Sequence, residues 1–467
     1  MCTRRGSSRS SPRREPELLP GVPPGGPGPL TPPRPSYARQ SLPLATRIGA
    51  SGRAGGPPVW SPRALSATSP GFRIPERWSF PRPDRAVDWG CLPNQTPRCT
   101  VQQKEPLPLP KEWGRTAFSE FLQQEDLPVI TGLAVPDLHE VETAPWARLD
   151  ARGAYLQLLG AEDTNIAYVL DLPPARATAV DHHLYEEVFF VLEGRGTCEV
   201  WSHSGARTSF EWQRGSVFAI PLNTFHRLHN GSGQQRARLL GVSTAPLMIN
   251  LLRNLDFVFG CPFDFTDRFR GEADYFTGEG TVYRRPDTTQ KIWETNFVSD
   301  VYNLHLYDWV ERGAGGKHMK FELANNTLIA HVSEFPVGTY KKAHRHGPGA
   351  HVVILHGQGY SLMWTDQHTD FEEIPWKPGT LFVPPGMWWH QHFNTGPTPA
   401  RYLAIRWGST KWKLTRYLDY QGVDKDAKAG GNQIEYADQD PRVHRMFVER
   451  CRANGVEVRM DAFLVRT

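Results

Sequence analysis

The chain has 467 residues, of which 39% are hydrophobic and 11% aromatic, and its formal net charge is +4. Residues 1–75 hold eleven Arg, no Lys and two Glu, a net +9, which leaves a net −5 on the rest of the chain. A mildly acidic body argues against a nucleic-acid partner, which needs clustered Lys and Arg. The sequence contains no uninterrupted run of about 18 apolar residues, so it predicts no membrane-spanning helix. Six scattered Cys without a CxxC motif predict reduced thiols, so we expect a soluble cytoplasmic protein.

Residues 1–75 are dominated by Pro, Gly, Ser and Arg. Such a composition does not bury enough apolar surface to offset the entropy lost on ordering. We therefore predict a disordered tail.

The following segments alternate between short apolar runs and turn residues, and only a few have helical spacing. A first β-barrel is predicted over residues 98–245, with a helix at 116–124 and strands at 154–159 and 165–172. A connecting segment follows at 246–325, with helical spacing at 247–259. A second barrel is predicted at 326–410, and an extension at 411–467 contains a helix near 441–453.

The two predicted barrels are copies of one module. Residues 170–243 align with 333–406 almost without gaps, so that His183 matches His346 and His226 matches His390. Each copy consists of short strands separated by Gly and Pro, which is typical of a closed barrel or a sandwich. The predicted fold class is all-β, with two double-stranded β-helix (jelly-roll) barrels and a few short peripheral helices.

The second copy carries a cupin signature with metal-ligand spacing. His344 and His346 share the parity of one strand face, and His390 comes from a strand on the other side of the barrel. Three imidazoles on facing strands form a partial ligand set for a divalent transition metal. Ala350 stands where many cupins have Glu, so the ligand set is neutral and favours an anionic, chelating substrate. Fe(II) is the expected metal, with Mn, Zn and Ni as alternatives.

Three further residues of this copy are candidates for the catalytic site. His392 has the parity of His390 and is a candidate base or hydrogen-bond donor. Trp388 and Trp389 directly precede a ligand and are expected to line an apolar pocket for a planar substrate.

The first copy has a different set at the same positions. Asp181, His183 and Glu187 share the inward parity, with His226 opposite. Two imidazoles and one or two carboxylates form a possible second metal site. A structural barrel without metal is an equally open reading.

The segments HRHGPGA (344–350) and WWHQH (388–392) resemble the active barrel of gentisate 1,2-dioxygenase-like bicupins, whose relatives act on salicylate and hydroxynaphthoate. The resemblance implies a ring-cleaving dioxygenase that uses O2, with His344, His346 and His390 as Fe(II) ligands. A hydroxylated aromatic carboxylate would be the substrate.

Two other functions stay open at this point. One is a non-oxidative metal cupin, an isomerase, lyase or decarboxylase that uses the metal as a Lewis acid. The other is a non-catalytic cupin that binds a small ligand. In each case we expect a small-molecule partner, no nucleic-acid or membrane partner, and a homo-oligomer.

Overall fold

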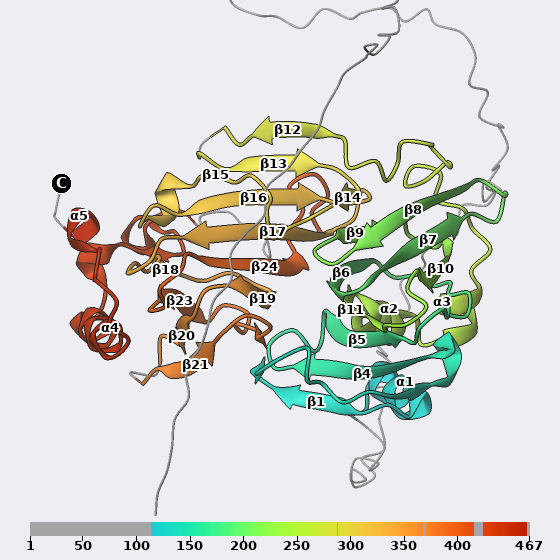
Figure 1. Cartoon of the computed structure of the whole chain (residues 1–467), viewed down its shortest axis with the longest axis horizontal. Coiled ribbons are helices and arrows are strands. Elements are labelled where there is room, and N and C mark those ends of the chain that lie inside the picture. Colours follow the sequence, from blue (N-terminus) through green and yellow to red (C-terminus); the bar gives the residue numbers. More distant parts are fainter. Residues whose placement is uncertain (1–113, 287, 368–369, 415–423, 465–467) are drawn as a thin grey trace, which may run out of the picture. The chain divides into compact units, whose positions relative to one another are not determined.

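The computed structural model describes residues 114–286, 288–367, 370–414 and 424–464 (Figure 1). The predicted tail at 1–75 and three of the six cysteines, Cys2, Cys91 and Cys99, lie outside the described residues. The other three cysteines are buried and free: Cys198, Cys261 and Cys451. Within the described residues no helix is long and apolar enough to cross a membrane.

The first barrel is built from a large and a small sheet (Figure 1). The large sheet has the order β1-β4-β5-β11-β6-β9-β14, with β3 beside β4, and the small sheet has the order β10-β7-β8. The strands are β1 (Val129–Gly132), β3 (Ala144–Trp146), β4 (Ala151–Leu158), β5 (Ile166–Leu172), β6 (Glu187–Glu193), β7 (Arg195–Trp201), β8 (Arg207–Gln213), β9 (Val217–Ile220), β10 (Phe225–Asn230), β11 (Ala237–Ser243) and β14 (Phe297–Val298).

The second barrel repeats this plan. Its large sheet has the order β12-β13-β16-β17-β24-β19-β22-β2, with β15 beside β16, and its small sheet has the order β21-β20-β23-β18-β25. The strands are β2 (Ala134–Val135), β12 (Thr281–Arg284), β13 (Lys291–Glu294), β15 (Tyr307–Asp308), β16 (Lys317–Glu322), β17 (Leu328–Phe335), β18 (Ala343–His344), β19 (His351–His356), β20 (Gly359–Trp364), β21 (Glu372–Trp376), β22 (Leu381–Phe382), β23 (Trp389–Asn394), β24 (Ala400–Trp407) and β25 (Gln433–Ile434). The all-β prediction is confirmed.

The two barrels exchange their entry strands. Strand β2 follows β1 of the first barrel in sequence but pairs with β22 of the second, while β14 follows β13 of the second barrel and pairs with β9 of the first. Linear boundaries such as 98–245 and 326–410 therefore miss part of the architecture. The repeat extends to these strands, because Ala134 pairs with Phe382 in the same way that Phe297 pairs with Phe218.

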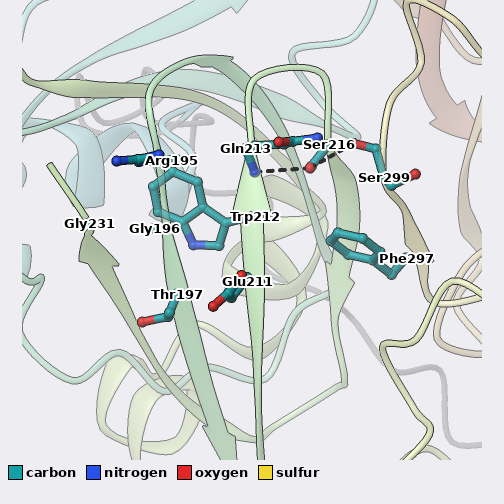
Figure 2. Close-up of a pocket in the computed structure, with 10 residues that line it drawn as sticks. All are labelled: Arg195, Gly196, Thr197, Glu211, Trp212, Gln213, Ser216, Gly231, Phe297 and Ser299. Carbon is teal, nitrogen blue, oxygen red and sulfur yellow. Dashed lines mark hydrogen bonds between the residues drawn. The ribbon is translucent and has the colours of Figure 1, made fainter. Parts of the chain in front are cut away.

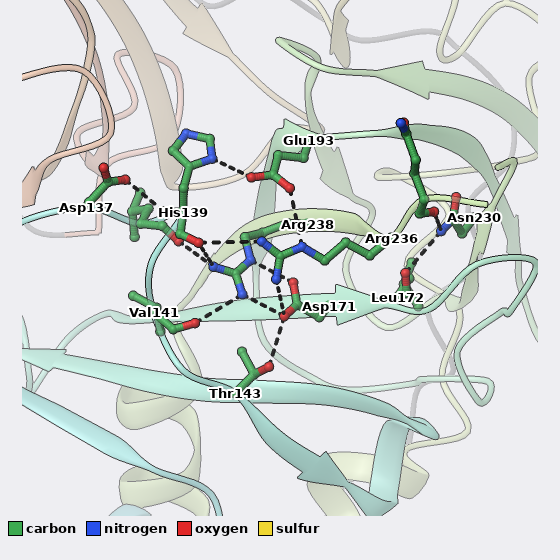
Figure 3. Close-up of polar contacts among 12 residues, drawn as sticks. Asp137, His139, Val141, Thr143, Asp171, Leu172, Glu193, Asn230, Arg236 and Arg238 are labelled. Carbon is green, nitrogen blue, oxygen red and sulfur yellow. Dashed lines mark hydrogen bonds and ion pairs between the residues drawn. The ribbon is translucent and has the colours of Figure 1, made fainter. Parts of the chain in front are cut away.

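An arginine in each barrel holds the segment that follows the exchanged strand, and Figure 3 shows the one in the first barrel, Arg238. Arg238 donates to both carboxylate oxygens of Asp171, each at 2.7 Å, and to the carbonyl oxygens of Leu138, His139 and Val141.

The second barrel has the same arrangement at equivalent positions. Arg401 pairs with Glu334 at 2.8 Å and donates to the carbonyls of Val301, Tyr302 and Leu304. A buried charge is tolerated only when it is paired and hydrogen-bonded. Both arginines meet this condition, because each pairs with a carboxylate and donates to backbone carbonyls of the segment that follows the exchanged strand.

The apolar core has one part shared by the barrels and parts inside each of them. The shared part packs residues of both large sheets, among them Leu156, Val188, Val353 and Leu403. Alternate residues of the same strands face the barrel interiors, as the period-two geometry of a strand requires. The interior of the first barrel is lined by a separate apolar and aromatic cluster.

The helices lie at the periphery. Helix α1 (Ala117–Glu125) begins at the predicted position with Thr116 as its N-cap. The predicted helix at 247–259 is two helices, α2 (Ala245–Leu252) and α3 (Leu255–Gly260), because Arg253 adopts a left-handed conformation that ends α2. Helix α4 (Pro441–Ala453) matches the prediction and is followed by the short α5 (Asp461–Leu464).

Candidate metal centre

Three histidines of the second barrel form a compact buried cluster. One ligand atom from each of His344, His346 and His390 can be chosen so that all three lie within 4.8 Å of one another. Register explains the pairing, because His344 on β18 lies directly opposite His390 on β23. The ring centroids of these two are 4.1 Å apart, and His346 lies 4.9 Å from His390. The predicted ligands are thus brought together; that they bind a metal remains a prediction.

These imidazoles are held in the neutral form that binds metals. Burial lowers the pKa of His390 to about 3. Burial and, to a smaller extent, the charge of Arg312 hold the pKa of His344 well below its usual range. Burial and Arg406 do the same for the pKa of His346. Metal binding requires deprotonated ligands, so this environment keeps the site ready for a cation.

The hydrogen bonds around the cluster fit a metal site. The Nδ1 atom of His390 lies 3.0 Å from the carbonyl oxygen of Trp388. That carbonyl accepts the Nδ1 proton, which leaves Nε2 unprotonated for a metal. Nδ1 of His344 is buried without a hydrogen-bond partner. Three neutral imidazoles suit Fe, Mn, Zn or Ni, with no carboxylate among the three to reduce the charge of the ion.

The three other predicted site residues, His392, Trp388 and Trp389, lie in different places relative to the histidine cluster. The ring of His392 lies 5.7 Å from that of His390 and 6.2 Å from that of His344, on the inner face. Trp388 is partly buried and packs against the apolar cluster inside this barrel. Trp389 has the opposite parity to His390, its Nε1 donates to Asp366 at 2.6 Å, and it lines a pocket that contains none of the three histidines; its predicted role at a substrate pocket stays a prediction.

Ala350 lies in an apolar wall of the same interior. It is 2% exposed and belongs to a cluster with Val352, Ile354, Met363 and Phe382. The position that holds Glu187 in the first barrel is therefore apolar here.

The rest of the interior is polar, which the motif analysis missed. The buried polar side chains of this face include His318, Lys320, Glu322, His331, Ser333, Lys341, Tyr402 and Arg406, and Lys320 pairs with Glu322 at 3.0 Å. Lys341 donates from Nζ to Ser333 and lies 3.2 Å from the hydroxyl of Tyr402. Burial, followed by the charge of Arg312, holds the pKa of Lys341 well below its usual range. Arg312 is fully buried, and its Nη2 donates to Asp424 while its guanidinium lies 4.5 Å from the ring of Trp309; among the described residues its Nε and Nη1 have no hydrogen-bond partner.

Comparing the two copies residue by residue would have revealed this polar face. Register pairs Leu170 with Leu239 in the first barrel, and Ser333 with Tyr402 at the same place in the second. Tyr168 likewise corresponds to His331, and Leu228 to His392.

The first barrel also brings its predicted ligands together. Ligand atoms of Asp181, His183 and His226 lie within 4.8 Å of one another. Glu187 Oε2 lies 3.2 Å from Nε2 of His183 and 3.7 Å from Nε2 of His226. All four side chains are buried.

These residues already satisfy one another. Arg148 pairs with Asp181 at 2.8 Å, and the hydroxyl of Tyr168 donates to Glu187 at 2.6 Å. Burial would lower the pKa of His183, but the carboxylates of Glu187 and Asp181 outweigh it and raise that pKa. Nε2 of His183 faces the carboxylate of Glu187, and its Nδ1 lies 3.0 Å from the carbonyl oxygen of Tyr185, an arrangement that does not need a metal, so both readings of this barrel stay open.

One large cavity lies away from both clusters. It has a volume of about 570 Å³ and opens over β7 and β8, next to Trp212 and Phe297 (Figure 2). None of its lining residues belongs to either histidine cluster.

Comparisons with known proteins agree with the fold. Residues 156–258 match the family model described as auxin binding protein. A search of curated proteins found no match. Among solved structures, an oxalate decarboxylase is 13% identical with a TM-score of 0.39, covering 59% of this chain and 77% of that one. A Bacillus subtilis oxalate decarboxylase with a two-residue deletion is 12% identical, with the same coverage and TM-score. At these values the structural likeness carries no argument about activity.

The duplicated two-sheet barrels and the family match over residues 156–258 give the chain an all-β, two-barrel, cupin-like fold. Each barrel holds a buried cluster with metal-ligand side chains. The comparisons do not single out the gentisate dioxygenase-like family that the motifs of the second barrel resemble.

Proposed function

We propose that this protein is a divalent-metal enzyme whose second barrel acts on a small anionic, chelating substrate. His344, His346 and His390 would hold the metal. When bound, the metal supplies Lewis acidity that polarises substrate oxygens.

One observation carries this proposal: the interior of the second barrel is polar at positions where the first barrel has apolar residues, such as Ser333, Tyr402 and His392 in place of Leu170, Leu239 and Leu228. Burying a polar or charged group without full compensation costs several kcal/mol. Arg312 is fully buried, and two of its nitrogens have no hydrogen-bond partner in the part of the chain that the structure describes. A barrel that only needed to fold would use the apolar residues of its twin, so we attribute the cations to binding of an anion.

The reaction we favour is non-oxidative, that of a lyase, decarboxylase or isomerase. The observation behind it is the array of Lys341, Ser333 and Tyr402, in which a buried amine meets two hydroxyls. Because burial holds its pKa well below the usual range, Lys341 gives up its proton more readily than an ordinary lysine and is suited to proton transfer. The Tyr402 ring lies 5.3 Å from that of His392, which connects this array to the histidine cluster.

A ring-cleaving dioxygenase is the second candidate. The apolar wall around Ala350 and the packing of Trp388 against it suit a planar aromatic ring beside the histidines. The motifs at 344–350 and 388–392 support the same reading.

Anaerobic purification, metal analysis and an oxygen electrode separate these functions. The assay would use hydroxylated aromatic acids, small dicarboxylates and enolisable diketones. Turnover without oxygen uptake, supported by Mn or Zn, is expected. Substrate-dependent oxygen uptake by protein with bound Fe would instead support the ring-cleaving dioxygenase and contradict the non-oxidative reaction. A protein that retains no metal and turns over none of these compounds would be a binding protein, and the proposal would be wrong.

A further inference from the structure

We propose that His392 is a fixed hydrogen-bond donor, presenting Nε2–H to an oxygen of the substrate, and that Ser361 and Trp376 set this tautomer. The inference rests on the proposed function and sharpens it. It gives His392 the role of a donor and removes it from the candidates for a general base.

The direction of the hydrogen bonds follows from what each group can donate. The indole Nε1 of Trp376 is only a donor, and it lies 3.0 Å from Oγ of Ser361. The same Oγ lies 2.8 Å from Nδ1 of His392. Ser361 is fully buried, and these are its two side-chain partners in the described part of the chain. Its hydroxyl hydrogen therefore has one acceptor within reach, Nδ1 of His392, because a buried hydroxyl left unpaired costs about 1–3 kcal/mol.

An imidazole that accepts at Nδ1 carries its proton at Nε2. This is the opposite tautomer to that of His390, whose Nδ1 donates to the carbonyl oxygen of Trp388. Two histidines two residues apart on β23 are thus prepared for different tasks. His390 offers an unprotonated Nε2 to a cation, and His392 offers a proton to an acceptor.

The first barrel shows that the strand pairing does not require this relay. Trp212 occupies the position of Trp376, since each pairs with the equivalent glycine, Gly196 or Gly359. Cys198 stands in place of Ser361, and Leu228 in place of His392.

As a result, Nε1 of Trp212 is buried without a hydrogen-bond partner, beside the cavity shown in Figure 2. The tryptophan is common to both barrels, whereas the serine and the histidine are features of the second barrel. We infer that the pair serves the ligand of the second barrel.

A fixed donor beside the metal ligands selects the substrate. It favours an oxygen that gains negative charge, such as a carboxylate or an enolate, and disfavours a group that presents its own hydrogen at that point. The apolar neighbour Phe382 lies 5.8 Å from the ring of His392, so this hydrogen bond would form in a poorly hydrated environment where it is strong.

The tautomer is measurable without metal or substrate. Protein deuterated and labelled with 15N only at histidine would give two-bond 15N–1H spectra, in which the signals missing from a His392→Gln variant identify His392. We expect an unprotonated Nδ1 and a protonated Nε2, and a changed tautomer ratio in Ser361→Ala. A protonated Nδ1 in the native protein would overturn the inference. Because this readout needs no metal, its failure is distinguishable from failure of the proposed function.

Binding provides the second readout. Co(II)-loaded protein would be titrated with salicylate and followed by the visible spectrum of the ion. His392→Leu, which copies the first barrel, should weaken salicylate binding by roughly 10- to 100-fold, the usual worth of a hydrogen bond to a charged group. His392→Gln, which keeps an N–H donor, should retain most of the affinity.

Cys198→Ala, at the matching position of the first barrel, is the control and should bind salicylate like the native protein. Unchanged cobalt content in every variant would exclude simple loss of the site. Native affinity in His392→Leu would contradict a donor role. If His392→Leu does not fold, Ser361→Ala tests the same relay, and native affinity with an unchanged tautomer in that variant would equally contradict it.

Discussion

The two barrels have the same strand order and register but opposite interiors. In each, the large sheet pairs residue for residue, and an arginine fixes the exchanged entry segment. Inside the first barrel the positions are filled by residues such as Tyr168 and Leu239. At the matching positions the second barrel places His331 and Tyr402. Either set of interior residues is therefore compatible with the same strand order and register.

This difference separates stability from function. Apolar interiors stabilise a barrel at about 25 cal/mol per Å² of buried surface, whereas buried polar groups need partners merely to avoid a penalty. The second barrel carries the residues that a fold alone would not select. Four sets of variants test this difference between the two barrels. They are given in order from the largest expected effect to the smallest.

Removing one ligand should have the largest effect. His390→Ala leaves two imidazoles, and we expect the second barrel to lose its metal without unfolding, because the side chain lies in a polar cluster rather than in the shared apolar core. Metal analysis and a thermal melt would measure both quantities.

His226→Ala is the matched change in the first barrel, at the position equivalent to His390. It should leave the metal of the second barrel in place. Metal lost from His226→Ala and retained by His390→Ala would place the centre in the first barrel and reverse the comparison.

The arginine clamps should differ in strength because their burial differs. The side chains of Arg238 and Asp171 are 2% and 6% exposed, while Glu334 of the other pair is 25% exposed. Removing one partner of a fully buried pair costs about 3–5 kcal/mol, which we expect for the free energy of unfolding of Arg238→Ala. Arg401→Ala should cost less. Urea unfolding would measure both, and an equal loss would show that exposure of Glu334 does not weaken its pair.

Much of this comparison was predictable from the sequence, and some of it was not. Gapless repetition predicted two equivalent barrels, and period-two parity placed His344, His346 and His390 on one face. The same parity rule places His351 on the face opposite to Ala350, where Val353 and Leu355 of its strand pack into the core between the barrels.

The failures came from long-range pairing. The exchange of β2 and β14 depends on contacts between segments at least 79 residues apart, which no local pattern encodes. Parity alone would have placed Trp389 on the face opposite to His390, where its Nε1 donates to Asp366. Lys341 and Arg312 carry no motif, and their role emerges only when their burial is known.

A third test concerns acid stability. His351 is fully buried with neither ring nitrogen hydrogen-bonded, and burial lowers its pKa to about 4. The unfolded chain, with a pKa near 6.5, binds the proton first, so stability falls as pH drops from about 6.5 to 4. The loss approaches about 3 kcal/mol at pH 4.

The first barrel has Val188 at this position. His351→Val should therefore lose less stability between pH 6.5 and 4 than the native protein, as measured by urea unfolding at each pH. Identical pH profiles would mean that His351 is not buried in the neutral form.

The smallest expected effect is a gain of stability. In Lys341→Met the chain loses a buried amine whose pKa is held well below its usual range. The unfolded state, with a pKa near 10.4, binds this proton more readily than the folded state, so the native protein is penalised below about pH 10. The variant should be more stable by about 1–2 kcal/mol at pH 7, and the difference should vanish above about pH 10.

Thr178→Val is the matched change at the equivalent position of the first barrel. The hydroxyl oxygen of Thr178 accepts a hydrogen bond from the backbone N–H of Leu228, so this variant should have a slightly lower free energy of unfolding. If Lys341→Met gains stability and loses turnover while keeping its metal, the amine is retained for the reaction and not for the fold. A variant that loses stability at pH 7 would mean that the bonds to Ser333 and Tyr402 outweigh the cost of burying the amine, and the contrast between the two interiors would then no longer separate stability from function.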